Sequence, residues 1–178
     1  MRTKVINFFG GPGSGKSATA ALLYGALVVY GYRADLIHTA NRDCDDLLPP
    51  AYKVIAEQRY RLETAAEHAD IIVCDHPILQ SLAYYGNLNE DARMMAAECY
   101  SMFDSANILL RHPNELLEPP QSSLLDETLD DLTDRIRIIL MEEAQGVYFE
   151  TVLDPNIESM MSKIIKYSRL RGIIHELG

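Results

Sequence analysis

The chain has 178 residues, of which 48% are hydrophobic and 24% charged, and this composition is typical of one globular domain. The 16 Lys and Arg against 26 Asp and Glu give a formal net charge of −10, which argues against general binding of nucleic acid, because that binding depends on neutralising phosphates. Glycines interrupt the apolar start of the chain, which excludes a secretory signal or a membrane span there, and the 3 scattered cysteines suit reduced thiols. We therefore expect a cytoplasmic protein.

Apolar runs alternate with helical stretches along the chain, and this alternation predicts an α/β fold in which helices cover both faces of a parallel sheet. The predicted strands are residues 5–9, 34–38, 70–75, 106–110 and 146–153. The predicted helices are residues 16–30, 51–69, 77–86 and 90–104, an acidic helix before the last strand, and a final helix from about residue 155. Residues 41–50 are polar and then proline-rich, which predicts a loop. No repeat or linker divides the chain, so we expect one domain over residues 1–178.

A glycine-rich stretch, GGPGSGKS, lies between the first predicted strand and the first predicted helix. It matches G-x-x-x-x-G-K-[ST], the phosphate-binding P-loop. Its glycines allow backbone angles that direct successive N–H groups at one anion, and the helix adds its positive dipole end. We expect the Lys16 ammonium to reach the β- and γ-phosphates and the Ser17 hydroxyl to bind Mg²⁺. The predicted nucleotide-binding residues are Gly11, Pro12, Gly13, Ser14, Gly15, Lys16 and Ser17.

Asp75 comes directly after the apolar run Ile71–Cys74, which is the most strand-like run in the chain. A carboxylate at the carboxyl end of a buried parallel strand faces the crevice where such sheets bind ligands. There Asp75 could hold Mg²⁺ through water or accept the proton of an attacking hydroxyl. The histidines form no ligand pattern, so we place His76 in the crevice and treat the other four as structural.

Two stretches of the first half, KVINFFGGPGSGKSATAALLYGALVVYGY and EQRYRLETAAEHADIIVCDHPILQSLAYYG, resemble a group of bacteriophage-encoded P-loop proteins. These proteins are usually labelled ATPases or nucleotide-kinase-like proteins. After the third strand they read D-S-P, where this chain has Asp75-His76-Pro77. The resemblance implies the three-layer α/β/α P-loop fold of nucleoside and nucleotide kinases, with a parallel sheet of about five strands. It also implies an acceptor site beside the loop after the second strand and a mobile lid after the fourth, and for a phage protein the cytoplasm would be that of the host.

The segment between the second and third strands favours phosphate transfer over other uses of a nucleotide. The chain has no N-K-x-D guanine motif and is too short for the lid domain of a mechanical ATPase, whereas this segment has the size of an acceptor site. Arg59 and Arg61 within it are candidate acceptor contacts. Its ANRD is similar to the N-R-D of polynucleotide 5′-hydroxyl kinases, which implies Asp43 as a base and Arg42 as a clamp, although a simple polar turn stays open.

The expected lid, RHPNELLEPPQSSLLDE, departs from that of its relatives. Arg111 stands at the end of the fourth strand, but no basic residue follows until Arg135. A kinase of nucleoside monophosphates needs several cations around two phosphate groups. The scarcity of cations therefore favours a hydroxyl acceptor.

We predict a Mg²⁺-dependent ATP phosphotransferase that acts on a nucleoside-type hydroxyl, with Lys16, Asp43 and Asp75 as catalytic residues and Ser17 and Asp75 at the metal. The specific hypothesis is a 5-hydroxymethyl pyrimidine in phage DNA as the acceptor. The basic tail from Lys163 to Arg171 could contact that DNA, although a solvated helix explains the same residues. Two alternatives stay open: a kinase of free nucleosides or nucleoside monophosphates, and a nucleotide switch in a phage assembly.

Overall fold

Parallel strands form the centre of the protein. Within the residues that the structure describes, five strands form one sheet in the order β2-β3-β1-β4-β5. The computed structural model describes residues 2–38, 51–84, 90–111, 129–152, 154 and 156–174. The strands are β1 (Lys4–Phe9), β2 (Ala34–Ile37), β3 (Ile71–Cys74), β4 (Asp104–Arg111) and β5 (Phe149–Val152). The predicted parallel sheet is therefore confirmed.

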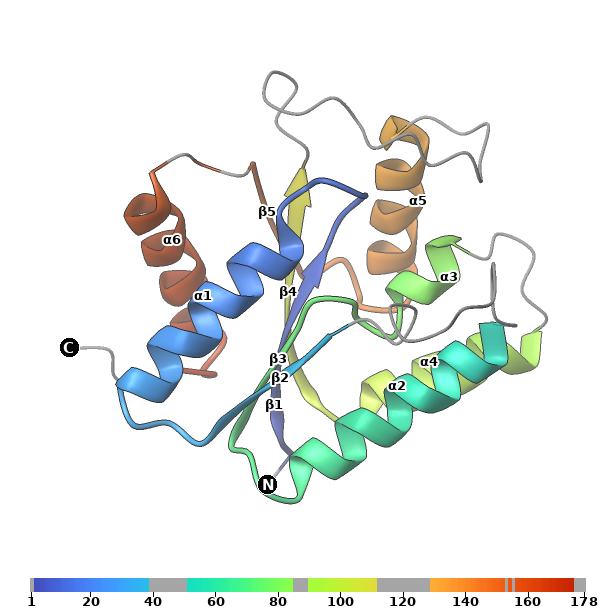
Figure 1. Cartoon of the computed structure of the whole chain (residues 1–178). Coiled ribbons are helices and arrows are strands. Elements are labelled where there is room, and N and C mark those ends of the chain that lie inside the picture. Colours follow the sequence, from blue (N-terminus) through green and yellow to red (C-terminus); the bar gives the residue numbers. More distant parts are fainter. Residues whose placement is uncertain are drawn as a thin grey trace.

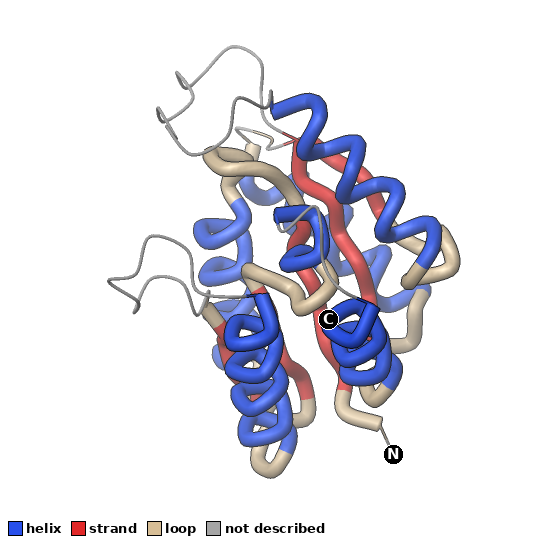
Figure 2. The backbone as a smooth tube through the Cα atoms, turned by 90° about the vertical axis from the view of Figure 1, so that its right-hand side faces the viewer, coloured by secondary structure: helices blue, strands red, loops and turns tan. Residues whose placement is uncertain are grey.

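Helices cover both faces of this sheet, as predicted (Figure 1). They are α1 (Lys16–Val29), α2 (Ala51–Ala66), α3 (Gln80–Tyr84), α4 (Glu90–Ser101), α5 (Leu129–Glu142) and α6 (Ile157–Leu170). Helices α1 and α6 lie on one face, and α2, α3, α4 and α5 lie on the other, which is the face turned toward the viewer in Figure 2. This arrangement is the three-layer α/β/α architecture. None of these helices is both long and apolar enough to cross a membrane.

Strand β3 shows why the core has two halves. All four of its residues are buried. Successive side chains of a strand point to opposite faces. Ile72 and Cys74 accordingly belong to the apolar cluster under α2 to α5, while Ile71 and Val73 belong to the cluster under α1 and α6. A run that is apolar throughout is therefore needed at this position in the sheet.

The strand order brings the two sequence motifs together. Strand β1 lies between β3 and β4, and the register pairs Asn7 of β1 with Cys74 of β3. The P-loop follows β1, and Asp75 follows β3. Both segments therefore leave the same carboxyl edge of neighbouring strands, at the point where the chain switches from one half of the sheet to the other, which is where open α/β sheets bind ligands.

Several predicted elements are shorter in the structure. The predicted helix at 77–86 begins only at Gln80, as α3, because successive turns precede it: Gln80 N–H donates to Pro77 O at 2.9 Å and Ser81 N–H donates to Ile78 O at 3.2 Å. Residues 85 and 86 lie outside the described residues. Helix α1 ends at Val29, and Gly31 follows with a φ of 85°, so the predicted stop at this glycine is confirmed. The predicted loop at 41–50 lies outside the described residues.

Candidate active site

The P-loop leaves β1 through Gly10, a glycine that the structure requires. Its φ is 144°, and a Cβ at this position would stand 2.3 Å from the carbonyl oxygen of Leu110 and 2.7 Å from Ser14 Oγ. The loop then closes on itself, with Ser14 N–H donating to Gly11 O at 3.3 Å. At its far end Gly15, with a φ of 86°, is the N-cap of α1. The chain thus passes from a buried strand into a helix N-terminus through a turn suited to an anion.

Lys16, the first residue of α1, lies back across this loop. Its Nζ donates to Gly11 O at 2.8 Å and stands 3.5 Å from Ser14 Oγ. The ammonium therefore places a positive charge on the loop that is predicted to hold the phosphates. Ser17 is the next residue of the same helix and is partly buried.

Asp75 is buried at the end of β3, with only 1% of its surface exposed. Its backbone N–H donates to Ile37 O at 3.1 Å, and its Oδ2 accepts a hydrogen bond from His38 Nδ1 at 3.0 Å. Among the described residues, its Oδ1 has no hydrogen-bond partner. A buried carboxylate oxygen without a partner is costly, so its position suits a ligand that completes it.

These residues fit a magnesium ion of the kind that accompanies a nucleotide. In the part of the chain that the structure describes, no group of three or more His, Cys, Asp or Glu side chains could hold a metal by itself. Mg²⁺ rarely uses such a cage, because it keeps several waters and binds through one or two carboxylates plus the phosphates of the substrate. Asp75 Oδ1, which has no partner among the described residues, and the hydroxyl of Ser17 at the start of α1 are oxygen donors of the kind that this mode uses.

His76, which follows Asp75 at the end of β3, is buried, with 7% of its surface exposed. Burial, followed by the nearby charge of Lys16, lowers the pKa of His76 to about 4, and the charge of Asp75 only partly opposes this. The imidazole is therefore neutral at pH 7. Its ring lies 5.6 Å from that of Tyr84 in α3, measured between centroids.

Two buried glutamines hold this site together, and the sequence analysis missed both. Gln80 of α3 is fully buried; its Oε1 accepts from Gly10 N–H at 3.1 Å and its Nε2 donates to Gly10 O at 3.0 Å. Gln58 of α2 donates from Nε2 to the carbonyl oxygen of His76 and stands 3.4 Å from Cys74 Sγ. One signal for Gln80 was available, because this amide interrupts the apolar run PILQSLAYY.

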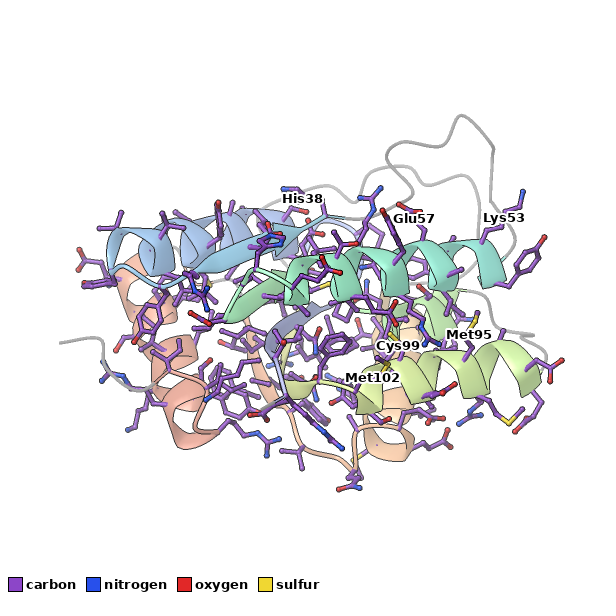
Figure 3. All side chains as sticks on the ribbon, turned by 90° about the horizontal axis from the view of Figure 1, so that it is seen from below. His38, Lys53, Glu57, Met95, Cys99 and Met102 are labelled. Carbon is purple, nitrogen blue, oxygen red and sulfur yellow. The ribbon has the colours of Figure 1, made fainter. Side chains whose placement is uncertain are left out.

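The two arginines predicted to contact an acceptor point in different directions from α2. Arg59 pairs with Glu63 at 2.9 Å and lies toward Cys99 of α4. Burial raises the pKa of the Cys99 thiol to about 11, and the charge of Arg59 opposes this rise. Figure 3 shows Cys99 between α2 and α4. Arg61 pairs with Glu57 at 2.8 Å, and its Nη1 stands 3.5 Å from His38 O. Of the two, Arg61 is thus the one placed at the end of β2.

The remaining predicted site residues are Arg42, Asp43 and Arg111. Arg42 and Asp43 lie outside the described residues. Arg111 is the last residue of β4, on the carboxyl edge of the sheet, and its Nε pairs with Glu150 Oε1 at 2.9 Å. Arg137 of α5 pairs with the same oxygen at 2.6 Å. The predicted lid arginine is therefore bound to β5.

The basic tail forms most of α6, and its end lies far from the P-loop. Arg171 Nη2 donates to Ser105 O at 3.3 Å, and Lys4 Nζ donates to Gly172 O. Ser105 and Lys4 stand at the starts of β4 and β1, so this end of the tail lies at the amino edge of the sheet. Lys163, nearer the start of α6, stands 3.5 Å from Asp154.

Comparisons with known proteins agree with this architecture. No protein-family model and no curated protein matches the chain. Among solved structures, a cysteine-to-alanine mutant of the APS kinase CysC from Mycobacterium tuberculosis is similar, with a TM-score of 0.52 and 17% identity, over 94% of this chain and 98% of that one. The structure of APE1195 is similar over 97% of both chains, with a TM-score of 0.52 and 19% identity. The protein therefore shares the α/β fold of these two structures.

Proposed function

We propose that this protein is a Mg²⁺-dependent phosphotransferase that moves the terminal phosphoryl group of ATP to a hydroxyl of a nucleoside-type acceptor. The observation that carries the proposal is the buried carboxylate of Asp75, whose Oδ1 has no hydrogen-bond partner among the described residues. It lies at the carboxyl edge of the strand beside β1, and β1 leads into a P-loop with its lysine in place. The fold shared with a solved APS kinase supports phosphoryl transfer as the reaction class.

The P-loop, Asp75 and Asp43 each have a role in the proposed reaction. The P-loop, residues 11–17, and the Lys16 ammonium bind the phosphates, and they position the terminal phosphoryl group. Ser17 and Asp75 hold the magnesium ion, which when bound neutralises charge that develops on the phosphate oxygens. Asp43 stays the proposed base for the acceptor hydroxyl.

For the acceptor, we propose a 5-hydroxymethyl pyrimidine, in DNA or as the free nucleoside. The sequence supports a hydroxyl rather than a phosphate acceptor because so few cations follow Arg111. Arg61, at the end of β2, pairs with Glu57, and the predicted lid residue Arg111 pairs with Glu150. Because both cations already have carboxylate partners, an acceptor that carries its own phosphates is also disfavoured. A DNA acceptor would make the reaction salt-sensitive, whereas a free nucleoside would not.

The test is transfer from γ-labelled ATP, screened over nucleosides, nucleoside monophosphates and DNA that contains 5-hydroxymethyluracil. The parent protein is expected to label one hydroxyl acceptor and to release ADP faster when that acceptor is present. Lys16→Ala is expected to abolish transfer while the circular dichroism spectrum is unchanged. Arg33→Ala is the matched control, because it removes an exposed cation that pairs with Asp70 before the start of β2, at the opposite edge of the sheet.

The outcomes separate the classes of function. Transfer by Lys16→Ala at the parental rate would show that the P-loop assignment is wrong. Label that stays on small molecules in the presence of modified DNA would exclude the DNA acceptor. Steady production of ADP that no acceptor changes would favour a nucleotide switch, and the next experiment would then compare partners bound in ATP and in ADP.

A further inference from the structure

We infer that His38 is a positioning residue for Asp75: its Nδ1–H fixes Oδ2 of the carboxylate and thereby leaves Oδ1 directed to the nucleotide-bound metal. This inference rests on the proposed function for the presence of a nucleotide with Mg²⁺, but it does not depend on phosphate transfer or on any acceptor. It gives a role to a histidine that the sequence analysis treated as structural.

The parallel pairing of two strands creates this contact. Strands β2 and β3 pair with Ile37 opposite Cys74, and His38 and Asp75 are the next residues of the two strands. The ladder continues one step further, because Asp75 N–H donates to Ile37 O at 3.1 Å. The two side chains then meet with His38 Nδ1 3.0 Å from Asp75 Oδ2. A carboxylate oxygen only accepts, so the imidazole nitrogen must be the donor.

Two side chains of α2 contact the backbone next to His38 and Asp75. Arg61 Nη1 stands 3.5 Å from the carbonyl oxygen of His38, and Gln58 donates to the carbonyl oxygen of His76 on the other side of Asp75. The backbone is thus fixed on either side of the carboxylate. The carboxylate itself is buried, whereas 47% of the His38 side chain is exposed. Within the described part of the chain, Oδ1 is the one oxygen of this carboxylate that no hydrogen bond holds.

Carboxylates that bind metals are usually oriented by a second hydrogen bond, and loss of that bond typically weakens the metal site by about 10–100-fold. If His38 orients Asp75, its removal should weaken the metal while the P-loop contacts to the phosphates stay intact. If His38 only packed at the end of β2, its removal would change neither the binding of the metal nor the contacts of the P-loop to the phosphates. The response to Mg²⁺ is therefore the measurement that distinguishes the two roles.

The experiment measures binding of a fluorescent ATP analogue over a Mg²⁺ titration, with three variants of His38. His38→Ala is expected to need about 10–100-fold more Mg²⁺ for half of its effect, while affinity without Mg²⁺ stays parental. His38→Asn should behave like the parent, because its amide nitrogen is as many bonds from the backbone as Nδ1. His38→Gln should behave like His38→Ala, because its amide nitrogen is one bond further out.

His68→Ala is the matched control. His68 also contacts an aspartate, with Nε2 3.2 Å from Asp35 Oδ2, but these side chains are 62% and 37% exposed. Asp35 lies near the start of β2 and not at its carboxyl end. Its Mg²⁺ response should be parental. A parental response from a folded His38→Ala would overturn the inference, and so would a defect in His38→Asn as large as that in His38→Ala. Parent protein that binds the analogue without any effect of Mg²⁺ would overturn it as well, whereas intact Mg²⁺ coupling without transfer to any acceptor would contradict only the proposed function.

Discussion

The contact between Gln80 and Gly10 allows a quantitative test of what holds the P-loop in place. One fully buried amide accepts from the Gly10 N–H at 3.1 Å and donates to the Gly10 carbonyl at 3.0 Å. Gln80→Met keeps nearly the same length and volume but removes both hydrogen bonds to Gly10, together with a longer one of 3.5 Å from Nε2 to the Tyr84 hydroxyl. It leaves two buried backbone groups without partners, at a cost of about 1–3 kcal/mol each. We expect the free energy of unfolding to fall by about 2–6 kcal/mol, a large part of the roughly 5–15 kcal/mol typical of a domain.

The assay is urea denaturation of the nucleotide-free protein, followed by titration with ATP. Because Gly10 opens the P-loop, the variant should also lose affinity for ATP. Ser81→Ala is the control at the next residue, since the Ser81 hydroxyl is buried and has no hydrogen-bond partner among the described residues, and its removal should cost little. A loss in Gln80→Met below about 1 kcal/mol, the value of one ordinary hydrogen bond, would refute this reasoning.

Two further predictions use the same denaturation assay. Gly10→Ala should lower the free energy of unfolding by about 2–4 kcal/mol, because the alanine would have a strained φ and its Cβ would overlap the Leu110 carbonyl. Gly25→Ala is the control: its Cβ would meet open space within α1, so it should raise the free energy of unfolding by about 1 kcal/mol. The second prediction concerns His76, whose pKa is about 4 in the folded protein against an ordinary 6.5. As pH falls, the unfolded chain therefore binds the proton first, and the free energy of unfolding decreases between about pH 6.5 and pH 4, by up to about 3 kcal/mol. His76→Gln should flatten this part of the curve, and an equally steep decline in that variant would contradict the assignment.

The sequence by itself was sufficient for the P-loop and for the sheet, because both depend on local patterns. Glycines at fixed spacing followed by Lys16 and Ser17 specify the turn through the backbone angles they allow. An unbroken apolar run such as Ile71–Cys74 specifies a strand buried on both faces. Asp75 could be predicted at the site for the same reason, since it follows that strand directly.

Only the tertiary structure decided which side chains complete the site, because their partners are distant in the chain. His38 meets Asp75 across 37 residues, and Gln80 meets Gly10 across 70. No local pattern encodes such pairs; they arise from the order in which β2, β3 and β1 lie side by side. Arg59 and Arg61 looked equivalent in the sequence, yet a helix turns by about 100° per residue, so residues two apart point in nearly opposite directions. One of the two therefore lies toward α4 and the other at the end of β2.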